Sequence, residues 1–506
     1  MGYCLFRYAF SRHSLVLALI TGLMLAGCAV GPDFKRPDAP QAKAYTAGSM
    51  PEKTAEAPVA GGASQHFIPG QDIPAQWWTL FHSEPLDKLI RQALANSPTL
   101  AAARASLRQA EENRRALFGA LLPSVDANVS VSREKISGAS QGEPDLNLPA
   151  FSLHNASVTV SYALDIFGGT RRQLEALESL VDYQRFQLEG AHLTLASNVV
   201  TAAIRESSLQ SQIKATQEIL ASQEQQLAIV EKQFQLGAVS GSDVLTQRTQ
   251  VAQTRAMLPP LENQLSQTRH SLAALTGGFP SETPLPEFNI ENLTLPENLP
   301  VSLPSSLVSQ RPDILASEAL MHEASAQVGV ATANLYPQVT LSGSYGTQAA
   351  SMNRMFSANS AAWDIGAGLL QPLFRGGALT AERRAAIAAY DQARANYQET
   401  VLQAFQNVAD VLRALETDAV ALKAQKDAET AARESLELTQ DQFKLGAISY
   451  LSLLIAERLY QQTRINLIQA QASRFADTAA LFQALGGGWW NRRSEDRQQQ
   501  NKHTGK

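Results

Sequence analysis

The thiol of Cys28 is the side chain whose surroundings predict a covalent modification. Two arginines precede an apolar run at residues 15–25, and the small residues Ala26 and Gly27 then lead into the cysteine. The run is short for a membrane helix but suits the apolar core of a signal peptide. Small residues directly before a cysteine favour a signal peptidase that cleaves ahead of a diacylated cysteine. The pattern therefore predicts removal of residues 1–27 and lipidation of Cys28.

Residues 25–28 resemble a bacterial lipobox. Residue 29 is alanine rather than aspartate, so the resemblance implies the outer membrane rather than retention at the inner membrane. The only other cysteine, Cys4, leaves with the signal peptide, so the mature chain has no disulfide although the periplasm permits one. A lipidated cysteine carries several acyl chains, which anchor more firmly than one. The alternative is an ordinary signal peptide that happens to contain Cys28.

Catalytic patterns are missing from the sequence. The eight histidines are scattered without zinc-binding spacing, and neither a phosphate-binding glycine loop nor a nucleophile elbow occurs. The net charge of −5 becomes −7 once the two arginines of the signal peptide are removed, and no basic patch indicates nucleic acid. We expect no enzyme activity, no cofactor, no metal site and no nucleic-acid partner.

The chain contains an internal repeat, which decides the fold. The segment QFQLGAVS at residues 233–240 recurs as QFKLGAIS at 442–449. Three further features occur once in each copy, in the same order and at nearly the same offset. They are a Leu-Pro or Tyr-Pro pair, a Phe-containing Gly-Gly turn, and a Leu-(Thr)-Gly-Gly ending. We predict two copies of one unit, at residues 84–278 and 313–488. Each copy consists of helix, strand, strand, very long helix, tight turn and helix.

Two strands are expected in each copy, at about 123–132 and 153–166 and at about 337–346 and 362–374. Polar and apolar residues alternate in all four, which is typical of half-buried strands and of membrane barrel strands. A small soluble sandwich is the alternative. Four strands are too few to close a membrane barrel, and an open edge is not tolerated in lipid. Several copies must therefore share one barrel; two would leave little bore, and three would leave a usable channel.

Two helices are expected to be exceptionally long. Residues 171–236 contain no proline and a single glycine, and residues 379–445 contain neither. At about 1.5 Å per residue each would extend about 100 Å. Apolar residues recur every three or four positions, as in coiled-coil seams. Shorter helices at 84–119 and 242–275 would lie end to end beside the first long helix, the second bent at Pro259-Pro260.

Three segments fall outside the repeats. Residues 28–83 form the lipidated, extended N-terminal segment, and the proline-rich residues 279–312 form an irregular linker around the middle of the helical cylinder. Residues 489–506 are polar and locally basic, so we expect a disordered C-terminal tail.

In these features the chain resembles the TolC/OprM class of outer-membrane efflux proteins, in its lipoprotein (NodT-like) branch of resistance-nodulation-division (RND) systems. The resemblance covers nearly all of the mature chain. It is carried by CAVGPDF at 28–34, WWTLF at 77–81, LPSSL at 303–307, RPDI at 311–314 and LFRGG at 373–377, together with the two Leu-Gly turns.

The resemblance implies a mainly α protein with a membrane β part. Three copies would form a twelve-stranded β-barrel continuous with a twelve-helix periplasmic α-barrel. The homotrimer would span the outer membrane, reach into the periplasm, and dock a periplasmic adaptor protein and an inner-membrane RND pump. Its function would be that of a passive, gated conduit exporting small molecules and drugs. The runner-up function is a TolC-like channel for type I protein secretion.

The resemblance also implies two kinds of site. The turns correspond to the periplasmic tips that meet the adaptor, namely Leu236, Gly237, Ala238 and Val239, and Leu445, Gly446, Ala447 and Ile448. The periplasmic gate corresponds to Leu451, Ile455 and Arg458, where relatives place an aspartate at the position of Ile455. From helix geometry Leu451 and Ile455 share a face, which would give two apolar rings in a trimer. The alternative is that both continue a coiled-coil seam. Glu457 and Asp441 are the two candidate partners of Arg458.

Overall fold

The structure is a computed structural model that describes residues 29–48, 51–142, 145, 147 and 149–492. The lipidation site predicted at Cys28 and the tail from residue 493 onward lie outside the described residues. The chain divides into two compact units. The sheet unit comprises residues up to Arg36, Ser106–Gln184 and Ser317–Tyr397; the hairpin unit comprises Pro37–Ala105, Arg185–Ala316 and Gln398 onward.

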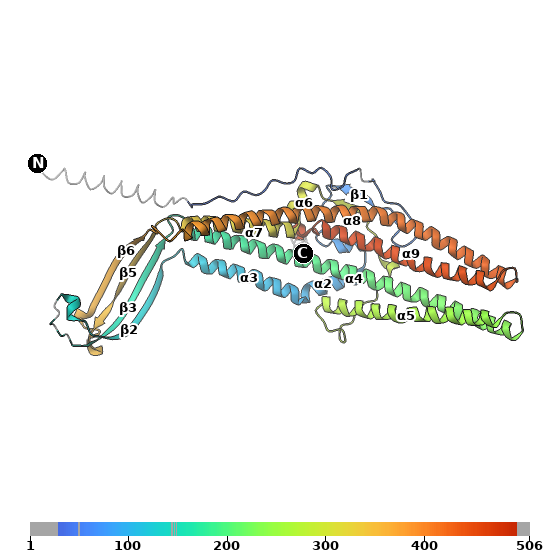
Figure 1. Cartoon of the computed structure of the whole chain (residues 1–506), viewed down its shortest axis with the longest axis horizontal. Coiled ribbons are helices and arrows are strands. Elements are labelled where there is room, and N and C mark those ends of the chain that lie inside the picture. Colours follow the sequence, from blue (N-terminus) through green and yellow to red (C-terminus); the bar gives the residue numbers. More distant parts are fainter. Residues whose placement is uncertain (1–28, 49–50, 143–144, 146, 148, 493–506) are drawn as a thin grey trace, which may run out of the picture. The chain divides into compact units, whose positions relative to one another are not determined.

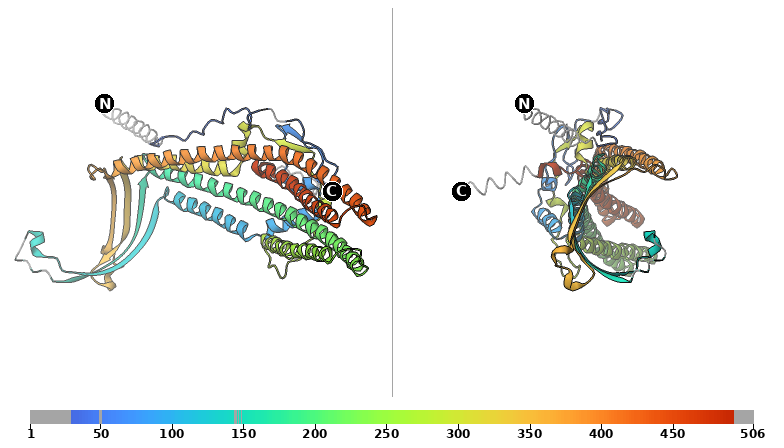
Figure 2. Two further views of the ribbon diagram at one scale, coloured as in Figure 1. Left: turned by 45° about the vertical axis from the view of Figure 1, so that its right-hand side comes forward. Right: turned by 90° about the vertical axis from the view of Figure 1, so that its left-hand side faces the viewer.

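One four-stranded antiparallel sheet dominates the sheet unit. Its strands follow the order β2, β3, β5, β6, with bounds Ser124–Glu134, Phe151–Leu164, Gln338–Ala349 and Ala361–Leu370. The sheet is a single curved layer (Figures 1 and 2). β6 ends four residues before the predicted end at 374, because Gln371 and Pro372 leave the ladder: the Gln371 amide turns back to the carbonyls of Leu335 and Pro372.

The two faces of this sheet differ in polarity. The strand register places Val125 opposite Val160, Val158 opposite Tyr345 and Tyr345 opposite Trp363, so these apolar side chains share one face. Serine, threonine, asparagine and aspartate occupy the other face, where Ser344 bonds to Asp364. Large apolar side chains of the first face are exposed in the protomer: Val125, Val129, Val131, Val158, Val160, Leu341, Tyr345, Trp363, Ile365 and Leu369. The alternation therefore reflects a two-faced sheet without a core of its own.

The helices confirm the predicted duplication. Each copy contains one helix of 67 residues, α4 at Gly169–Gln235 and α8 at Ala378–Lys444. Each long helix is followed by a tight turn and a helix of 35 residues, α5 at Gly241–Leu275 and α9 at Tyr450–Ala484. Helices of 22 residues precede the strands, α3 at Pro98–Gly119 and α7 at Pro312–Ala333. Among the described residues no helix combines the length and apolarity needed to cross a membrane.

The helix predicted at 84–119 is interrupted. It forms α2 at Glu84–Asn96 and α3 from Pro98, with Ser97 extended between them. Pro98 disfavours the helical conformation of the residue before it. The Ser97 hydroxyl then caps α3 by accepting from the amide of Leu100 at 3.4 Å. By contrast, α5 continues through Pro259 and Pro260.

In the hairpin unit α5 runs antiparallel to the C-terminal part of α4. Arg248 pairs with Glu231, Arg255 with Glu224 and Arg269 with Glu206. In α8, apolar residues that recur every three or four positions, as predicted from the sequence, are buried: Val401, Val408, Leu412, Leu415, Ala419 and Leu422. Fully burying one such side chain stabilises the fold by about 1.5–3 kcal/mol.

The linker is more regular than predicted. It contains the short helix α6 at Pro304–Gln310, the 3-10 turn η3 at Ile290–Asn292 and the strand β4 at Asn298–Val301. β4 pairs in parallel with β1 at His66–Pro69, which belongs to the N-terminal segment. Pro304 favours the start of α6, because proline is favoured in the first turn of a helix. Short 3-10 turns also occur at Trp77–Phe81 (η1), Gly138–Gln141 (η2), Met352–Arg354 (η4) and Ala358–Ser360 (η5).

The predicted disorder of the C-terminal tail is wrong for its first residues. Trp489–Asn491 form the 3-10 turn η6. The Trp489 indole donates to the carbonyl of Gln310 at 2.7 Å, and the Trp490 indole donates to Asp72 at 2.9 Å. An indole combines an apolar ring, which packs against other residues, with an N–H group that needs a hydrogen-bond acceptor. Both tryptophans have such an acceptor here.

Candidate functional site at the helical turns

Both helical hairpins turn in the same way. Gly237 has φ +76° and Gly446 has φ +71°. The amide of Gly237 donates to Phe234 O at 2.9 Å, and that of Ala238 donates to Gln233 O at 2.8 Å; Gly446 and Ala447 make the equivalent bonds to Phe443 and Gln442. This is the Schellman motif, in which a left-handed glycine satisfies the last carbonyls of a helix. The two Leu-Gly turns are therefore first of all helix C-caps.

The side chains of these turns are largely uncovered. Leu236 and Leu445 are among the exposed large apolar residues of the protomer. Val239 and Ile448 are half-buried, and Val239 packs against a core made by Val230, Val244, Tyr450, Leu453 and Leu454. That core holds the two turns in one compact end of the hairpin unit. The sequence-predicted tip residues thus combine a rigid backbone with free apolar side chains.

The start of α9 separates into two faces. Leu453 and Leu454 are buried in the core behind the turns, whereas Leu451 and Ile455 are 64% and 60% exposed. Arg458 is exposed on the same side as Ile455 and helps to line a groove of about 560 Å³ between α5 and α9. Within the protomer, Leu451 and Ile455 therefore do not continue the coiled-coil seam. They form a free apolar stripe one helical turn apart.

Neither candidate partner of Arg458 contacts it in the protomer. Asp441 bonds to Lys444 at 2.9 Å. Glu457 is only 6% exposed, whereas Arg458 is exposed. Burial raises the pKa of Glu457 to about 7, against an ordinary value near 4.5. The burial of Glu457 was not predicted from the sequence, because the neighbours that bury it come from other helices.

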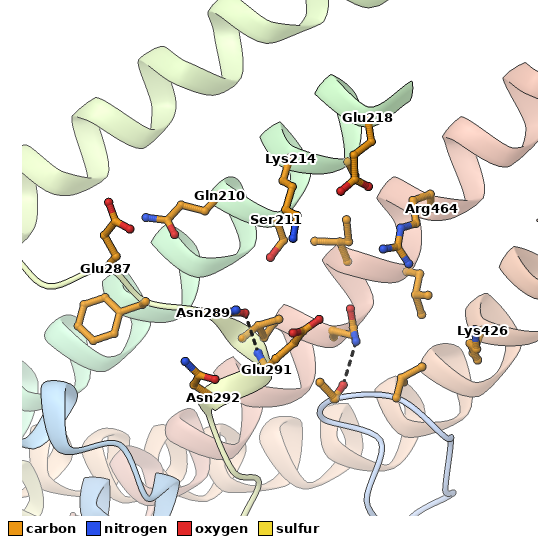
Figure 3. Close-up of a pocket in the computed structure, with 18 residues that line it drawn as sticks. Gln210, Ser211, Lys214, Glu218, Glu287, Asn289, Glu291, Asn292, Lys426 and Arg464 are labelled. Atoms are coloured by element: carbon orange, nitrogen blue, oxygen red, sulfur yellow. Dashed lines mark hydrogen bonds between the residues drawn. The ribbon is translucent and has the colours of Figure 1, made fainter. Parts of the chain in front are cut away.

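A larger cavity, which the sequence did not reveal, lies in the hairpin unit. It measures about 710 Å³, and α4, α8, α9, the linker and residues 59–60 border it (Figure 3). Its charged lining is mixed, with Lys214, Lys426 and Arg464 facing Glu218, Glu287 and Glu291. Lys426 is held by Glu429 at 2.8 Å. The contributing residues come from five separate segments, so no local pattern announces the cavity.

The first described residues are fixed within the sheet unit. Arg172 donates to the carbonyl of Val30 and, at 2.7 Å, to Asp33. The amide of Val30 donates to Phe167 O at 3.0 Å. Gly31 lies so close to Gly329 that a β-carbon would be 2.4 Å from the Gly329 Cα. The chain that would follow a lipidated Cys28 is therefore held tightly just after β3.

A sheet with one exposed apolar face, joined in sequence to paired long helices, defines a protomer of the outer-membrane channel type. The comparisons agree. A family model described as outer membrane efflux protein matches residues 89–278 and 303–487. The pyoverdine export outer membrane protein OpmQ of Pseudomonas putida is 33% identical over 446 residues, covering 86% of this chain and 92% of that protein. The chain belongs to the outer membrane efflux protein family.

Two further likenesses cover more of the chain. The probable efflux pump outer membrane protein TtgC of Pseudomonas putida is 29% identical over 499 residues, covering 97% of this chain and 99% of that protein. The solved structure of the outer-membrane channel OprN superposes with a TM-score of 0.81 at 27% identity, covering 91% of this chain and all of that chain. The chain is accordingly an outer-membrane channel component of an efflux system.

Proposed function

We propose that three copies of this chain assemble into one channel with a shared twelve-stranded barrel in the outer membrane. The supporting observation is the state of the sheet: β2 and β6 are edge strands, and the apolar face is uncovered in the protomer. Unpaired edges and an apolar face are both costly in water, and an open edge is not tolerated in lipid. Joining β2 of one copy to β6 of the next removes the edges and gives the apolar face to lipid.

The proposed channel is a passive conduit without catalysis. Its helical turns dock a periplasmic adaptor, and an inner-membrane RND pump supplies the energy and the small molecules that pass. The exposed Leu236 and Leu445, held on rigid Schellman turns, provide the apolar contacts for the adaptor. Leu451, Ile455 and Arg458 constrict the periplasmic entrance.

Native mass spectrometry of the detergent-solubilised protein tests this assembly. The expected mass corresponds to three copies, and planar-bilayer recordings of the same sample should show conductance. A stable monomer with full conductance would refute both the shared barrel and the trimer.

We also propose that Cys28 is the lipidated mature N-terminus. Labelled palmitate should enter the wild-type protein and be absent from Cys28→Ala. The variant should still assemble, because the barrel itself provides membrane burial. Label retained in the variant would contradict the assignment.

A further inference from the structure

A second, smaller cavity lies in the hairpin unit among α4, α8 and α9. It measures about 220 Å³ and shares Ala215, Glu218 and Arg464 with the larger cavity of Figure 3. None of its lining residues belongs to the turns or to the proposed gate. Its lining combines apolar walls, among them Ile219 and Leu436, with polar groups that the fold leaves unsatisfied.

Two of the polar lining residues are almost fully buried and carry side-chain atoms without hydrogen-bond partners in the described part of the chain. Among the described residues, Oε2 of Glu457 has no hydrogen-bond partner. The side-chain amide of Gln223 is 1% exposed, and neither its oxygen nor its nitrogen has a partner there. Leaving such groups unpaired costs about 1–3 kcal/mol each, and more for a charged group. Both line the same cavity, so a bound molecule could satisfy both.

The charges around the cavity favour a cation. α4 contributes Glu218, α9 contributes Glu457 and Arg464, and the α8 lining residues, Leu436 and Gln440, are uncharged. Figure 3 shows Glu218 and Arg464 extending from α4 and α9 at one end of the larger cavity. Arg464 also forms an ion pair with Glu429 of α8, at 3.9 Å. With all three lining groups ionised, the cavity has one excess negative charge, at the buried carboxylate.

The size and the walls favour an organic cation over a bare metal ion. A calcium ion takes six to eight oxygen ligands at about 2.3–2.6 Å. This cavity has room for several water-sized groups, and Ala215, Ile219 and Leu436 would contact hydrocarbon rather than a hydration shell. An ammonium group donates up to three hydrogen bonds, which suits a carboxylate beside a carboxamide oxygen.

We propose that this cavity is a binding site for a small primary ammonium ion with a short hydrocarbon chain. The ammonium donates to Glu457 and to the Gln223 oxygen, and the chain lies against Ile219 and Leu436. The site is separate from the proposed conduit function, and it would remain if the trimer or gate proposals failed.

Occupancy should depend on pH through Glu457. Burial raises the pKa of Glu457 to about 7, so the carboxylate that receives the ammonium is mostly ionised at pH 8 and mostly protonated at pH 6. A short alkylammonium stays charged across this range. Its affinity should therefore fall about tenfold from pH 8 to pH 6.

Isothermal titration calorimetry of the full-length protein in detergent at pH 8 tests the site, with butylammonium chloride as the probe. One ion should bind per protomer. Butan-1-ol, which has similar size without charge, should bind at least about tenfold more weakly, and sodium chloride at the same concentration should not displace the probe. Glu457→Gln, which keeps the shape of the side chain, should weaken binding about tenfold or more.

Two further variants separate the site from general effects. Glu434→Gln removes an exposed carboxylate from α8 and should leave affinity unchanged. Leu436→Trp should fill the cavity and abolish binding while Glu457 remains. Three results would overturn the proposal: equal binding of the alcohol, displacement by sodium, or unchanged affinity in Glu457→Gln. A fourth result, no binding heat with butylammonium, would overturn it as well.

Discussion

The two turns and the helices that follow them have the same backbone conformation but differ in their side chains. Each turn ends in a Schellman motif, each next helix begins after a serine N-cap, Ser240 or Ser449, and each helix runs for 35 residues. In the first copy Asp243 completes a capping box with Ser240, whereas the second copy has Ser452 at that place. Duplication thus preserved the geometry of the tip.

The difference lies one turn further along each helix. Aligned on the two serine caps, Ser242 and Thr246 of α5 correspond to Leu451 and Ile455 of α9. Likewise, Arg248 of α5, exposed and paired with Glu231, corresponds to the buried Glu457 of α9. The first copy therefore presents an ordinary polar surface where the second copy has an exposed apolar stripe and a buried acid. We infer that the second copy carries the specialised features of the channel entrance.

The largest expected effect concerns the apolar stripe. Leu451→Ala combined with Ile455→Ala should open the entrance, raising single-channel conductance and sensitising cells to large antibiotics. Thermal stability should stay nearly unchanged, because both side chains are exposed in the protomer. Bilayer recordings and antibiotic susceptibility measure the effect.

The first copy supplies the matched control for this double variant. Ser242→Ala with Thr246→Ala should leave conductance at the wild-type value. If the second-copy double variant instead lost several kcal/mol of stability without leaking, the two residues would be packing residues of an interface and the gate proposal would be wrong.

An intermediate effect is expected at the turn glycines. Gly237→Val and Gly446→Val place a β-branched residue at positive φ, at a cost of about 1–3 kcal/mol each. The turns should distort locally, so export should decline while the amount of assembled channel stays constant. Drug accumulation and cross-linking of an engineered tip cysteine to the adaptor measure the change.

Asparagine is the control at the same positions, because it tolerates the left-handed conformation. Within the described part of the chain, and apart from the residues adjacent to each glycine, no atom lies within 4 Å of the position a β-carbon would take, so backbone strain is the main penalty. Unchanged drug resistance in both valine variants would argue against docking at the turns.

The smallest expected effect is a pH dependence of stability. The pKa of Glu457 is raised in the folded state, so the folded protein binds its proton more tightly than the unfolded chain does. Its contribution to stability is greatest below about pH 4.5 and is lost as pH rises through about 7. Glu457→Gln should therefore stabilise the protein at pH 8 by about 1–3 kcal/mol and flatten the change in melting temperature between pH 5 and pH 8.

The corresponding change in the first copy is Arg248→Gln. It removes an exposed ion pair and should alter stability by less than about 1 kcal/mol at either pH. An equal loss of pH dependence in both variants would show that surface charge, rather than the buried acid, causes it.

The sequence predicts features that repeat or alternate. The long helices, the four strands and the two turns could be read because period, length and glycine placement are local properties. The interruption at Ser97 also had a local signal, Pro98, which the periodic pattern of the surrounding helix outweighed. The ordered linker and the contacts of Trp489 had no such signal, because their partners lie far away in the sequence.

In the candidate site, too, some features follow from local sequence signals and others depend on contacts distant in the sequence. The left-handed conformation of Gly237 and Gly446 follows from glycine at a helix end. The exposure of Leu451 and Ile455 in the protomer does not, because apolar residues at that spacing equally suit a seam. It follows from the burial of Leu453 and Leu454 in the core behind the turns. Burial of Glu457 beside Gln223 depends on three helices meeting, and no pattern within α9 encodes it.

The parallel pairing of β1 with β4 has a consequence for the order of folding. β1 leaves the ribosome early, but its partner strand at Asn298–Val301 belongs to the middle of the chain. Arg474, which bonds to Thr54 and Ala63 of the same N-terminal segment, is made near the end. Residues 51–69 therefore complete their contacts late in synthesis. The residues just after Cys28 have nearer partners, because Val30 and Asp33 bind Phe167 and Arg172, so the N-terminal segment gains its contacts in two stages.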